Sequence, residues 1–284
     1  MLGRPDKGYR ITLLQSSSDR ALDLVELLQK KGLLSVGSCR LGQQIRVGEI
    51  DMALEFFDEM EKLIPVLKQE EGNMRKAGHI IAQSIMSGGI LQAFGSGHSA
   101  CVAVEICGGA GGLIPSKQVK ELSGGQYERI EGVGTAFAEM WDIRKNDCLF
   151  IISNSGRNPL VIEMAIAGRS IGVPVIAVTG LEVSKHTTSR HSSGKMLWQL
   201  ADVILDNHSV EGDAAIEVPG LPTKIGGTSR ISADIMVDQT MVFAVHEMLE
   251  ADYVPPVFMS ANVDGGPEFN KEYTAKYADR LYHV

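Results

Sequence analysis

The chain has 284 residues, 44% of them hydrophobic, which is enough for one large or two modest domains with a substantial core. A net charge of −8 without long Lys/Arg runs argues against nucleic-acid binding, but a few local donors can still hold a small anion. No apolar run is long enough to cross a bilayer, and the N-terminus lacks the apolar core of a signal peptide. We therefore expect a cytoplasmic protein, with no membrane or nucleic-acid partner and with reduced cysteines.

Residues 1–47 differ from the rest of the chain and are predicted to be an N-terminal extension. Residues 18–28 have helical periodicity, with Ser18 or Asp19 as the N-cap. This piece is similar to the first helix of the winged-helix domain of IclR-type transcription regulators. No recognition helix follows it, because residues 32–48 are Gly-rich and irregular.

From residue 48 to the end, helical and extended patterns alternate. Residues 48–87 are predicted to be helical, with breaks or bends at Pro65, Gly72 and Gly78. Irregular loops are expected at 116–126 and 184–194. The chain then predicts strands at 90–94, 148–152, 173–178 and 203–205, and helices from His98 and over 128–141, 158–171 and 229–250. Apolar strands separated by helices predict a parallel sheet flanked by helices on both faces, with N-terminal helices and an irregular C-terminal tail.

The most informative segment is the loop from Phe94 to Ser99, which lies between a predicted strand and a predicted helix. Its glycines, Gly95 and Gly97, let the backbone come close to a ligand, and Ser96 and Ser99 can donate hydrogen bonds. The helix that follows adds free N–H groups and a partial positive charge. Such a loop is suited to bind an anion at the carboxyl end of a strand, where parallel α/β sheets bind ligands.

Other interpretations of glycine-containing segments are weaker. A dinucleotide site would need an acidic residue about 20 positions after Gly95, and residues 111–117 contain none. A hydrolase nucleophile elbow around Ser99 would need a small residue where Cys101 stands. A phosphate loop ending at Lys195 lacks both the first glycine and the following Ser or Thr.

A second loop, from Ser153 to Asn158, also follows an apolar strand and precedes a helix. On neighbouring strands, two such loops can converge, so that Ser96, Ser99, Ser153 and Ser155 surround one tetrahedral anion. The alternative is that each loop only caps its helix. The presence of two Gly- and Ser-rich loops favours a binding site.

These loops resemble the two phosphate-binding motifs of SIS (sugar isomerase) domains, and Gly226 to Ser229 looks like the third Ser/Thr segment of that fold. The resemblance is greatest to bacterial SIS domain-containing proteins of the phosphosugar isomerase branch and covers residues 48–284. It rests on seven segments: 94–99, 110–113, 128–132, 151–158, 189–195, 217–222 and 255–266. It implies a flavodoxin-like three-layer fold and a homodimer or higher homo-oligomer. It also implies an anionic sugar as ligand.

Taken together, the loops and the resemblance assign a set of candidate substrate-binding residues. They are Gly95, Ser96, Gly97, Ser99, Ser153, Asn154, Ser155, Asn158, Lys195, Thr228, Ser229 and Asn262. Asn262 belongs to the tail 255–270, which we expect to cover the site of a neighbouring subunit. No cofactor and no metal are expected, because His186 and His191 lack convincing metal-ligand spacing.

Aldose–ketose isomerisation moves a proton between C1 and C2 through an enediolate, which requires a general base, an acid and donors to the oxyanion. The candidate bases are Glu105, expected to be partly buried, and Glu131, expected near the start of the helix 128–141 and favoured by the resemblance. The candidate acids are His98 and His191, whereas His246 is expected to be a packing residue. We thus predict an isomerase of a phosphorylated or sulfonated sugar; a non-catalytic sugar-phosphate regulator and a sugar ether lyase remain as alternatives.

Overall fold

The computed structural model describes residues 54–282, which belong to one compact unit, Leu54–Val284. The predicted extension 1–47, with its helix at 18–28, lies outside the described residues, so this boundary stays a prediction. Within the described part, no helix is long and apolar enough to cross a membrane.

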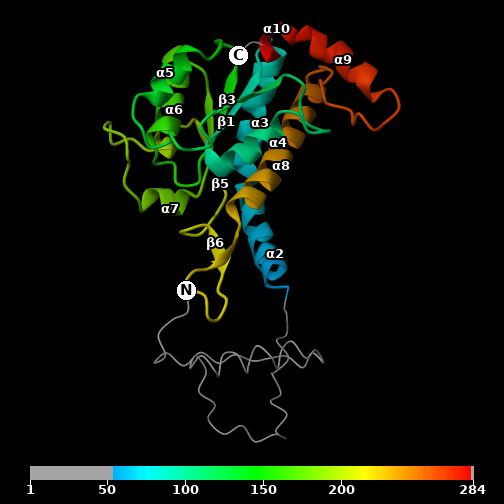
Figure 1. The fold of residues 1–284 in the computed structure, drawn as a ribbon. Coiled ribbons are helices and arrows are strands. Elements are labelled where there is room, and N and C mark those ends of the chain that lie inside the picture. The colour runs from blue at the N-terminus through cyan, green and yellow to red at the C-terminus, as the bar shows by residue number, and fades with distance from the viewer. Residues whose placement is uncertain (1–53, 283–284) are drawn as a thin grey trace, which may run out of the picture. The chain divides into compact units, whose positions relative to one another are not determined.

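A five-stranded parallel sheet forms the centre of the unit (Figure 1). The strands are β1 Leu91–Gly95, β2 Ser116–Val119, β3 Cys148–Ile152, β4 Val175–Thr179 and β5 Val203–Asp206. Their order is β2-β1-β3-β4-β5, the flavodoxin-like order, and every neighbouring pair is parallel. Every residue of β1, β3 and β4 is buried, as a sheet covered on both faces requires. The predicted parallel α/β fold is confirmed.

Helices cover both faces of this sheet and complete three layers (Figure 1). One face of the sheet, to which Leu91, Ala93 and Phe150 point, is covered by α3 (Glu71–Met86), α4 (Ala100–Ile106) and α8 (Ser229–Glu250). The other face, to which Phe94 and Leu149 point, is covered by α5 (Val133–Glu139) and α6 (Pro159–Ile171). The alternation follows from the two-residue period of a strand. The other helices before the C-terminal segment are α2 (Glu55–Leu67) and α7 (Leu181–Lys185).

The first helical region is interrupted between α2 and α3, at a 3-10 turn over Lys68–Glu70. The expected breaks at Gly72 and Gly78 are wrong, because both glycines lie inside α3, while Pro65 lies within the last turn of α2. Gly78 has a packing role instead. A Cβ at this position would lie 2.9 Å from the Cβ of Phe243 on α8, so glycine permits the close approach of the two helices.

The segment 116–141 differs from the prediction in two ways. Its first residues form the edge strand β2 instead of an irregular loop. The predicted helix 128–141 is also wrong in its first part, since only α5 is helical and the residues before it form turns. Gly124, Gly125 and Gly132 have φ values of 64°, 91° and 93°, which interrupt a right-handed helix. Glu128 and Glu131 therefore lie in turns.

The C-terminal segment is more regular than predicted. It contains α9 (Gly266–Lys276) and α10 (Ala278–Leu281), so the expected irregular tail is confined to the residues before Gly266. Those residues pair with the chain near β2: the N–H of Gly111 donates to the carbonyl of Phe258 at 2.9 Å, and the N–H of Phe258 donates to the carbonyl of Gly112 at 2.8 Å.

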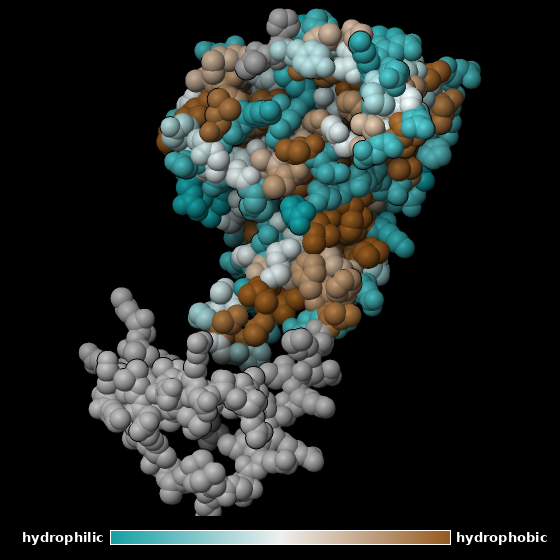
Figure 2. Space-filling model, turned by 45° about the vertical axis from the view of Figure 1, so that its right-hand side comes forward, coloured by the Kyte–Doolittle hydropathy of each residue, from teal (hydrophilic) through white to brown (hydrophobic). Residues whose placement is uncertain are grey.

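A two-stranded hairpin, β6 (Ala214–Ile216) and β7 (Ile225–Gly227), was not predicted. It packs on α2, since a Cβ at Gly226 would lie 2.9 Å from the ring of Phe56. Apolar side chains gather at this end of the unit (Figure 2), where Leu54, Phe57 and Leu221 are 68%, 65% and 51% exposed.

Candidate functional site

The first predicted anion loop follows β1 as expected. Gly95 ends the strand, Ser96 is extended, and Gly97–Ser99 form one 3-10 turn that leads into α4. A Cβ at Gly95 would lie 2.5 Å from the Ser99 carbonyl oxygen, and Gly97 has a φ of 58°, so both positions require glycine. Ser96 Oγ is buried and has no hydrogen-bond partner among the described residues. Such an orphan hydroxyl in a native site calls for a bound group or water.

The second loop follows β3 and is held rigidly. Ser153 Oγ accepts the Gly156 N–H at 3.2 Å. The backbone carbonyl of Asn154 accepts the Gly180 N–H at 2.9 Å. The side-chain Oδ1 of Asn154 accepts hydrogen bonds from Nδ2 of Asn207 at 3.1 Å and from the hydroxyl of Ser209 at 2.5 Å. Asn154 thus links the carboxyl ends of β3, β4 and β5.

The start of α8 is the third segment of the site. Thr228 is the N-cap, and Ser229 donates its N–H and its hydroxyl to Asp213 at 2.8 and 2.9 Å. Asn207 also donates to the Ser229 carbonyl at 3.4 Å. Asn207 therefore connects the second loop to the third segment. From the sequence, these two segments could be grouped only through the resemblance to SIS domains.

These three segments enclose a narrow space of about 10 Å³ beyond the carboxyl ends of β1 and β3, the point where the strand order reverses. His98 stands at this space with its side chain 64% exposed and its Nε2 3.9 Å from Asp213 Oδ2. An exposed side chain can move aside and widen the entrance. The lining residues are His98, Ser99, Val102, Ile152, Asn154, Asn207, Ser229 and Arg230.

A second cluster surrounds His191, in the polar loop that precedes β5. Its Nε2 lies 3.6 Å from a Glu131 oxygen and 3.5 Å from a Glu163 oxygen, and its Nδ1 lies 2.7 Å from Ser193 Oγ. Ser192 donates its N–H to Glu131 at 2.8 Å and also donates its hydroxyl. These two hydrogen bonds, and then the charge of His191, hold the pKa of Glu131 below its usual value.

The turns over residues 120–132 connect the two clusters. Gly125 lies against the first anion loop, since a Cβ there would be 3.0 Å from the Cα of Gly97. Further along, the carbonyl of Glu128 accepts the N–H of Leu160 in the first turn of α6 at 3.3 Å. The segment that ends at Glu131 therefore runs from the first anion loop to the helix that follows the second.

Other predicted site residues lie away from this space. Glu105 is exposed instead of partly buried, and its charge helps to raise the pKa values of Asp234 and Asp238 on α8, after the effect of their burial. Lys195 is exposed in the 186–195 loop. Asn262 lies beyond the C-terminal end of α8, whereas the site is at its N-terminal end, 22 residues or about 33 Å away. Its role toward a neighbouring subunit stays a prediction.

Ser155 and Asn158 belong to the second loop but not to the lining of the narrow space. The Ser155 carbonyl accepts the Ser184 hydroxyl at 2.8 Å, and Asn158 Oδ1 accepts a guanidinium N–H of Arg190 at 2.8 Å. Asn158 is nevertheless buried, and it is the N-cap of α6. Between residues 54 and 282, no three His, Cys, Asp or Glu side chains are grouped so that they could hold a metal ion.

Sequence reasoning missed Asn207, Asp213 and Glu163. Asn207 follows β5 directly, so a polar residue after a predicted strand was the available signal. Glu163 is buried on α6 and accepts the N–H groups of Gly132 at 2.5 Å and Thr135 at 2.9 Å, which caps α5. Nothing local in the sequence indicates that long-range contact.

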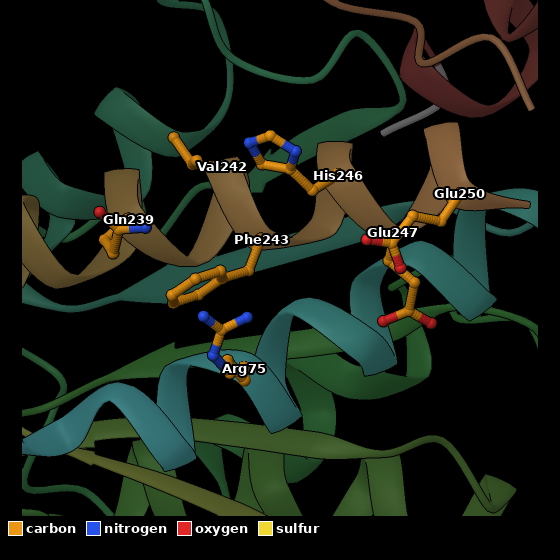
Figure 3. A pocket seen from close by; sticks show the side chains of 7 residues that line it. All are labelled: Arg75, Gln239, Val242, Phe243, His246, Glu247 and Glu250. Atoms are coloured by element: carbon orange, nitrogen blue, oxygen red, sulfur yellow. The ribbon is translucent and has the colours of Figure 1, made fainter.

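A larger hollow, about 680 Å³, lies on the outer surface of α3 and α8 (Figure 3). Arg75 stacks on the ring of Phe243 at 4.2 Å, and His246 is exposed here, so the expected packing role of His246 is wrong. Gln239 lines this hollow and lies on α8, ten residues or about 15 Å along the helix from Ser229 of the candidate anion site. Since it contains none of the loop donors, this hollow is not the anion site.

The family model "SIS domain" matches residues 55–180, which include both loops. The chain belongs to the UPF0309 protein family. It is 50% identical to a UPF0309 protein of Listeria monocytogenes over 234 residues, 82% of this chain and 100% of that protein. A UPF0309 protein of Geobacillus thermodenitrificans is 36% identical over 237 residues, 80% of this chain and 95% of that protein.

Solved structures that match part of the chain include the phosphoheptose isomerase GmhA from Neisseria gonorrhoeae, with a TM-score of 0.47 and 20% identity over 68% of this chain and 96% of that chain. Another is the sugar isomerase domain of an RpiR transcription factor from Sphaerobacter thermophilus, with a TM-score of 0.44 and 17% identity over 80% of this chain and 96% of that chain.

Proposed function

We propose that the protein is an aldose–ketose isomerase of a phosphorylated or similarly anionic sugar. The observation that carries the proposal is the unpartnered, buried hydroxyl of Ser96 in a loop that lies beside a second hydroxyl-bearing loop. Membership of the SIS domain class supports the same ligand chemistry.

The phosphate is assigned to the space lined by Ser99, Asn154 and Ser229, next to Ser96 of the first loop. The hydroxyl of Ser99 and the amide of Asn154 offer hydrogen bonds to an anion, and Arg230 in the lining adds positive charge, whereas the N–H and hydroxyl of Ser229 are donated to Asp213. His98 at the entrance can donate to the anion or to the sugar ring oxygen. Binding energy from this non-reacting group then fixes C1 and C2 against the base.

Glu131 is assigned as the general base. The pKa of Glu131 lies below its usual value, so the carboxylate is ionised near neutral pH although it is a weaker base than an unperturbed glutamate, and its two hydrogen bonds from Ser192 fix its position. His191 beside it is assigned as the proton donor for the developing hydroxyl of the enediolate. Glu163, on the other side of His191, is a positioning residue, because it is buried and caps the start of α5, whereas the side chain of Glu131 is exposed.

Proton exchange is the direct test. Purified protein is incubated in D2O with a panel of aldose and ketose phosphates, and deuterium at C1 or C2 is measured by NMR. Glu131→Gln should lower exchange by roughly 10²- to 10⁴-fold without loss of phosphate binding. Glu139→Gln, at an exposed position on α5, is the matched control and should behave as wild type.

Binding is measured separately by calorimetry. Ser96→Ala should weaken sugar-phosphate binding by roughly 10- to 100-fold, since a hydrogen bond to a charged group is lost. Ser170→Ala, at an exposed position on α6, should not. Binding that depends on Ser96 without any exchange would contradict the isomerase and favour the non-catalytic sugar-phosphate regulator.

A further inference from the structure

Three arginines gather beside the second anion loop, in a chain that has 27 basic and 35 acidic residues. Arg157 belongs to that loop, and the backbone N–H of Arg190 donates to the carbonyl of Arg157 at 2.9 Å. Arg129 lies in the turns before α5, next to Glu128, whose carbonyl accepts the N–H of Leu160 in the first turn of α6. We call Arg129, Arg157 and Arg190 the arginine cluster.

The arginine cluster has little negative charge to balance it. Over residues 54–282, the single carboxylate group within 4 Å of its guanidinium nitrogens is that of Glu128, whose Oε1 lies 3.9 Å from Arg129 Nε. Arg157 bonds instead to the Thr188 hydroxyl at 3.3 Å, and Arg190 to Asn158 Oδ1 at 2.8 Å, both neutral acceptors. Arg157 Nε is buried with no partner in the described part of the chain.

The three positive charges of the arginine cluster repel one another. The pKa of the Arg190 guanidinium lies below its usual value, first because of desolvation and then because of the positive charges of Arg157 and Arg129. A guanidinium presents its donors in a planar fork that matches the oxygens of a carboxylate or a phosphate. An oxyanion among the three side chains would remove the repulsion and give Arg157 Nε an acceptor.

The arginine cluster is close enough to the phosphate space for one ligand to reach both. Asn154 lines that space, and Arg157 is three residues further along the same loop, at most roughly 11 Å in an extended chain. Asn158, which is bonded to Arg190, is buried at the start of α6, so the N-terminus of this 13-residue helix adds to the positive potential.

We infer that the arginine cluster binds a second oxyanion of the substrate, so that the preferred ligand is a sugar phosphate with a further phosphate or carboxylate. The inference rests on the proposed function and narrows its substrate class. A single negatively charged handle would leave the cluster unoccupied, whereas a doubly acidic sugar would occupy both places.

Calorimetry with three probes tests this inference: fructose 6-phosphate, fructose 1,6-bisphosphate and 6-phosphogluconate. At least one doubly acidic probe should bind at least 10-fold tighter than the monophosphate, or about 1.4 kcal/mol. A preference for the bisphosphate alone would identify the second group as a phosphate, and a preference for 6-phosphogluconate alone as a carboxylate. Equal affinity for all three overturns the inference.

Variants assign the effect to the cluster. Arg129→Gln and Arg157→Gln should each weaken binding of the preferred doubly acidic probe by at least 10-fold and bring its affinity close to that of the monophosphate. Arg169→Gln is the matched control, since Arg169 is half-exposed and paired with Asp202 at 3.2 Å. Less than a 3-fold change in both cluster variants, with folding confirmed by circular dichroism, overturns the inference.

The two proposals fail differently. If Ser96→Ala leaves the affinity for every probe unchanged and no probe exchanges deuterium, the proposed function is wrong. If Ser96→Ala weakens all probes but the two arginine variants do not discriminate among them, only the second oxyanion site is wrong.

Discussion

Arg280 on α10 connects the C-terminal end of the chain to the sheet, and its replacement offers a strong test of the structure. The side chain is 7% exposed and donates to Asp147 at 2.6 Å and to Asp142 at 3.2 Å. Asp147 is fully buried at the start of β3, where it also accepts the Ile90 N–H at 2.9 Å and Gln92 Nε2 at 2.8 Å. Arg280→Ala would remove the guanidinium that bonds directly to this buried carboxylate and leave Lys117 and Arg144 as the positive charges near it.

The cost follows from that environment. Removal of one partner from a buried ion pair costs about 3–5 kcal/mol. Asp147 would retain neutral donors from Ile90, Gln92 and the Arg144 N–H, so we expect the lower end, about 3 kcal/mol. For a unit of this size, 1 kcal/mol corresponds to about 2–4 °C in Tm, so the variant should melt about 6–12 °C below wild type.

Thermal and urea unfolding, followed by circular dichroism, measure the difference. Arg144→Ala is the control: this side chain is 50% exposed and pairs with Asp142 at 2.9 Å, so its loss should cost at most about 1 kcal/mol. A loss below 1 kcal/mol for Arg280→Ala, or equal losses for the two variants, would refute the placement of α10.

Three other predictions concern the segments around the site. Gly95→Ala should cost about 1–3 kcal/mol and weaken sugar-phosphate binding, because its Cβ would meet the Ser99 carbonyl at 2.5 Å. In the control Gly72→Ala, the added Cβ has no described atom within 4 Å, so this variant should stabilise α3 by about 0.5–1 kcal/mol. Equal changes in the free energy of unfolding of the two variants, measured in urea, would contradict the loop geometry. Burial opposes ionisation of Glu121, but hydrogen bonds from Ser123 and Gly125 prevail and hold its pKa below 4.5. The ionised Glu121 therefore stabilises the folded state fully above pH 4.5, and this stabilisation is lost as the pH falls through the lower pKa of the folded state. The difference in Tm between wild type and Glu121→Gln should then become smaller on acidification, and a larger difference would count against this capping role. Glu163→Ala should cost about 1–3 kcal/mol by freeing the N–H groups of Gly132 and Thr135, whereas the exposed Glu182→Ala should stay within about 0.5 kcal/mol; similar Tm values for the two would show that α5 needs no such cap.

The core of the fold was predictable because its signals are local. Apolar runs such as 148–152 are buried in any parallel sheet, and α8 was predicted with the bounds that it has, Ser229–Glu250. The failures have equally specific causes. Gly132 has a positive φ and is the N-cap of α5, so the helix begins at Val133 and Glu131 lies in the turn before it, although the residue types alone favoured a helix.

The site was predictable in part for the same reason. The two hydroxyl-rich loops follow strands whose parallel order brings their carboxyl ends to one edge, so Ser96 and Ser153 could be grouped from the sequence. Glu163 and His191 could not, because their proximity depends on a polar loop that folds over the start of α6.

The sequence by itself determined four of the five strands of the parallel sheet, the helix after each anion loop and the glycines that these loops need, since each depends on neighbours a few residues apart. Only the tertiary structure decided which charges meet. It placed Glu105 away from the site, joined Glu131 to Ser192, and brought three arginines together beside Asn158. Contacts between residues 28 to 61 positions apart depend on how the segments pack, and short-range periodicity carries no record of that packing.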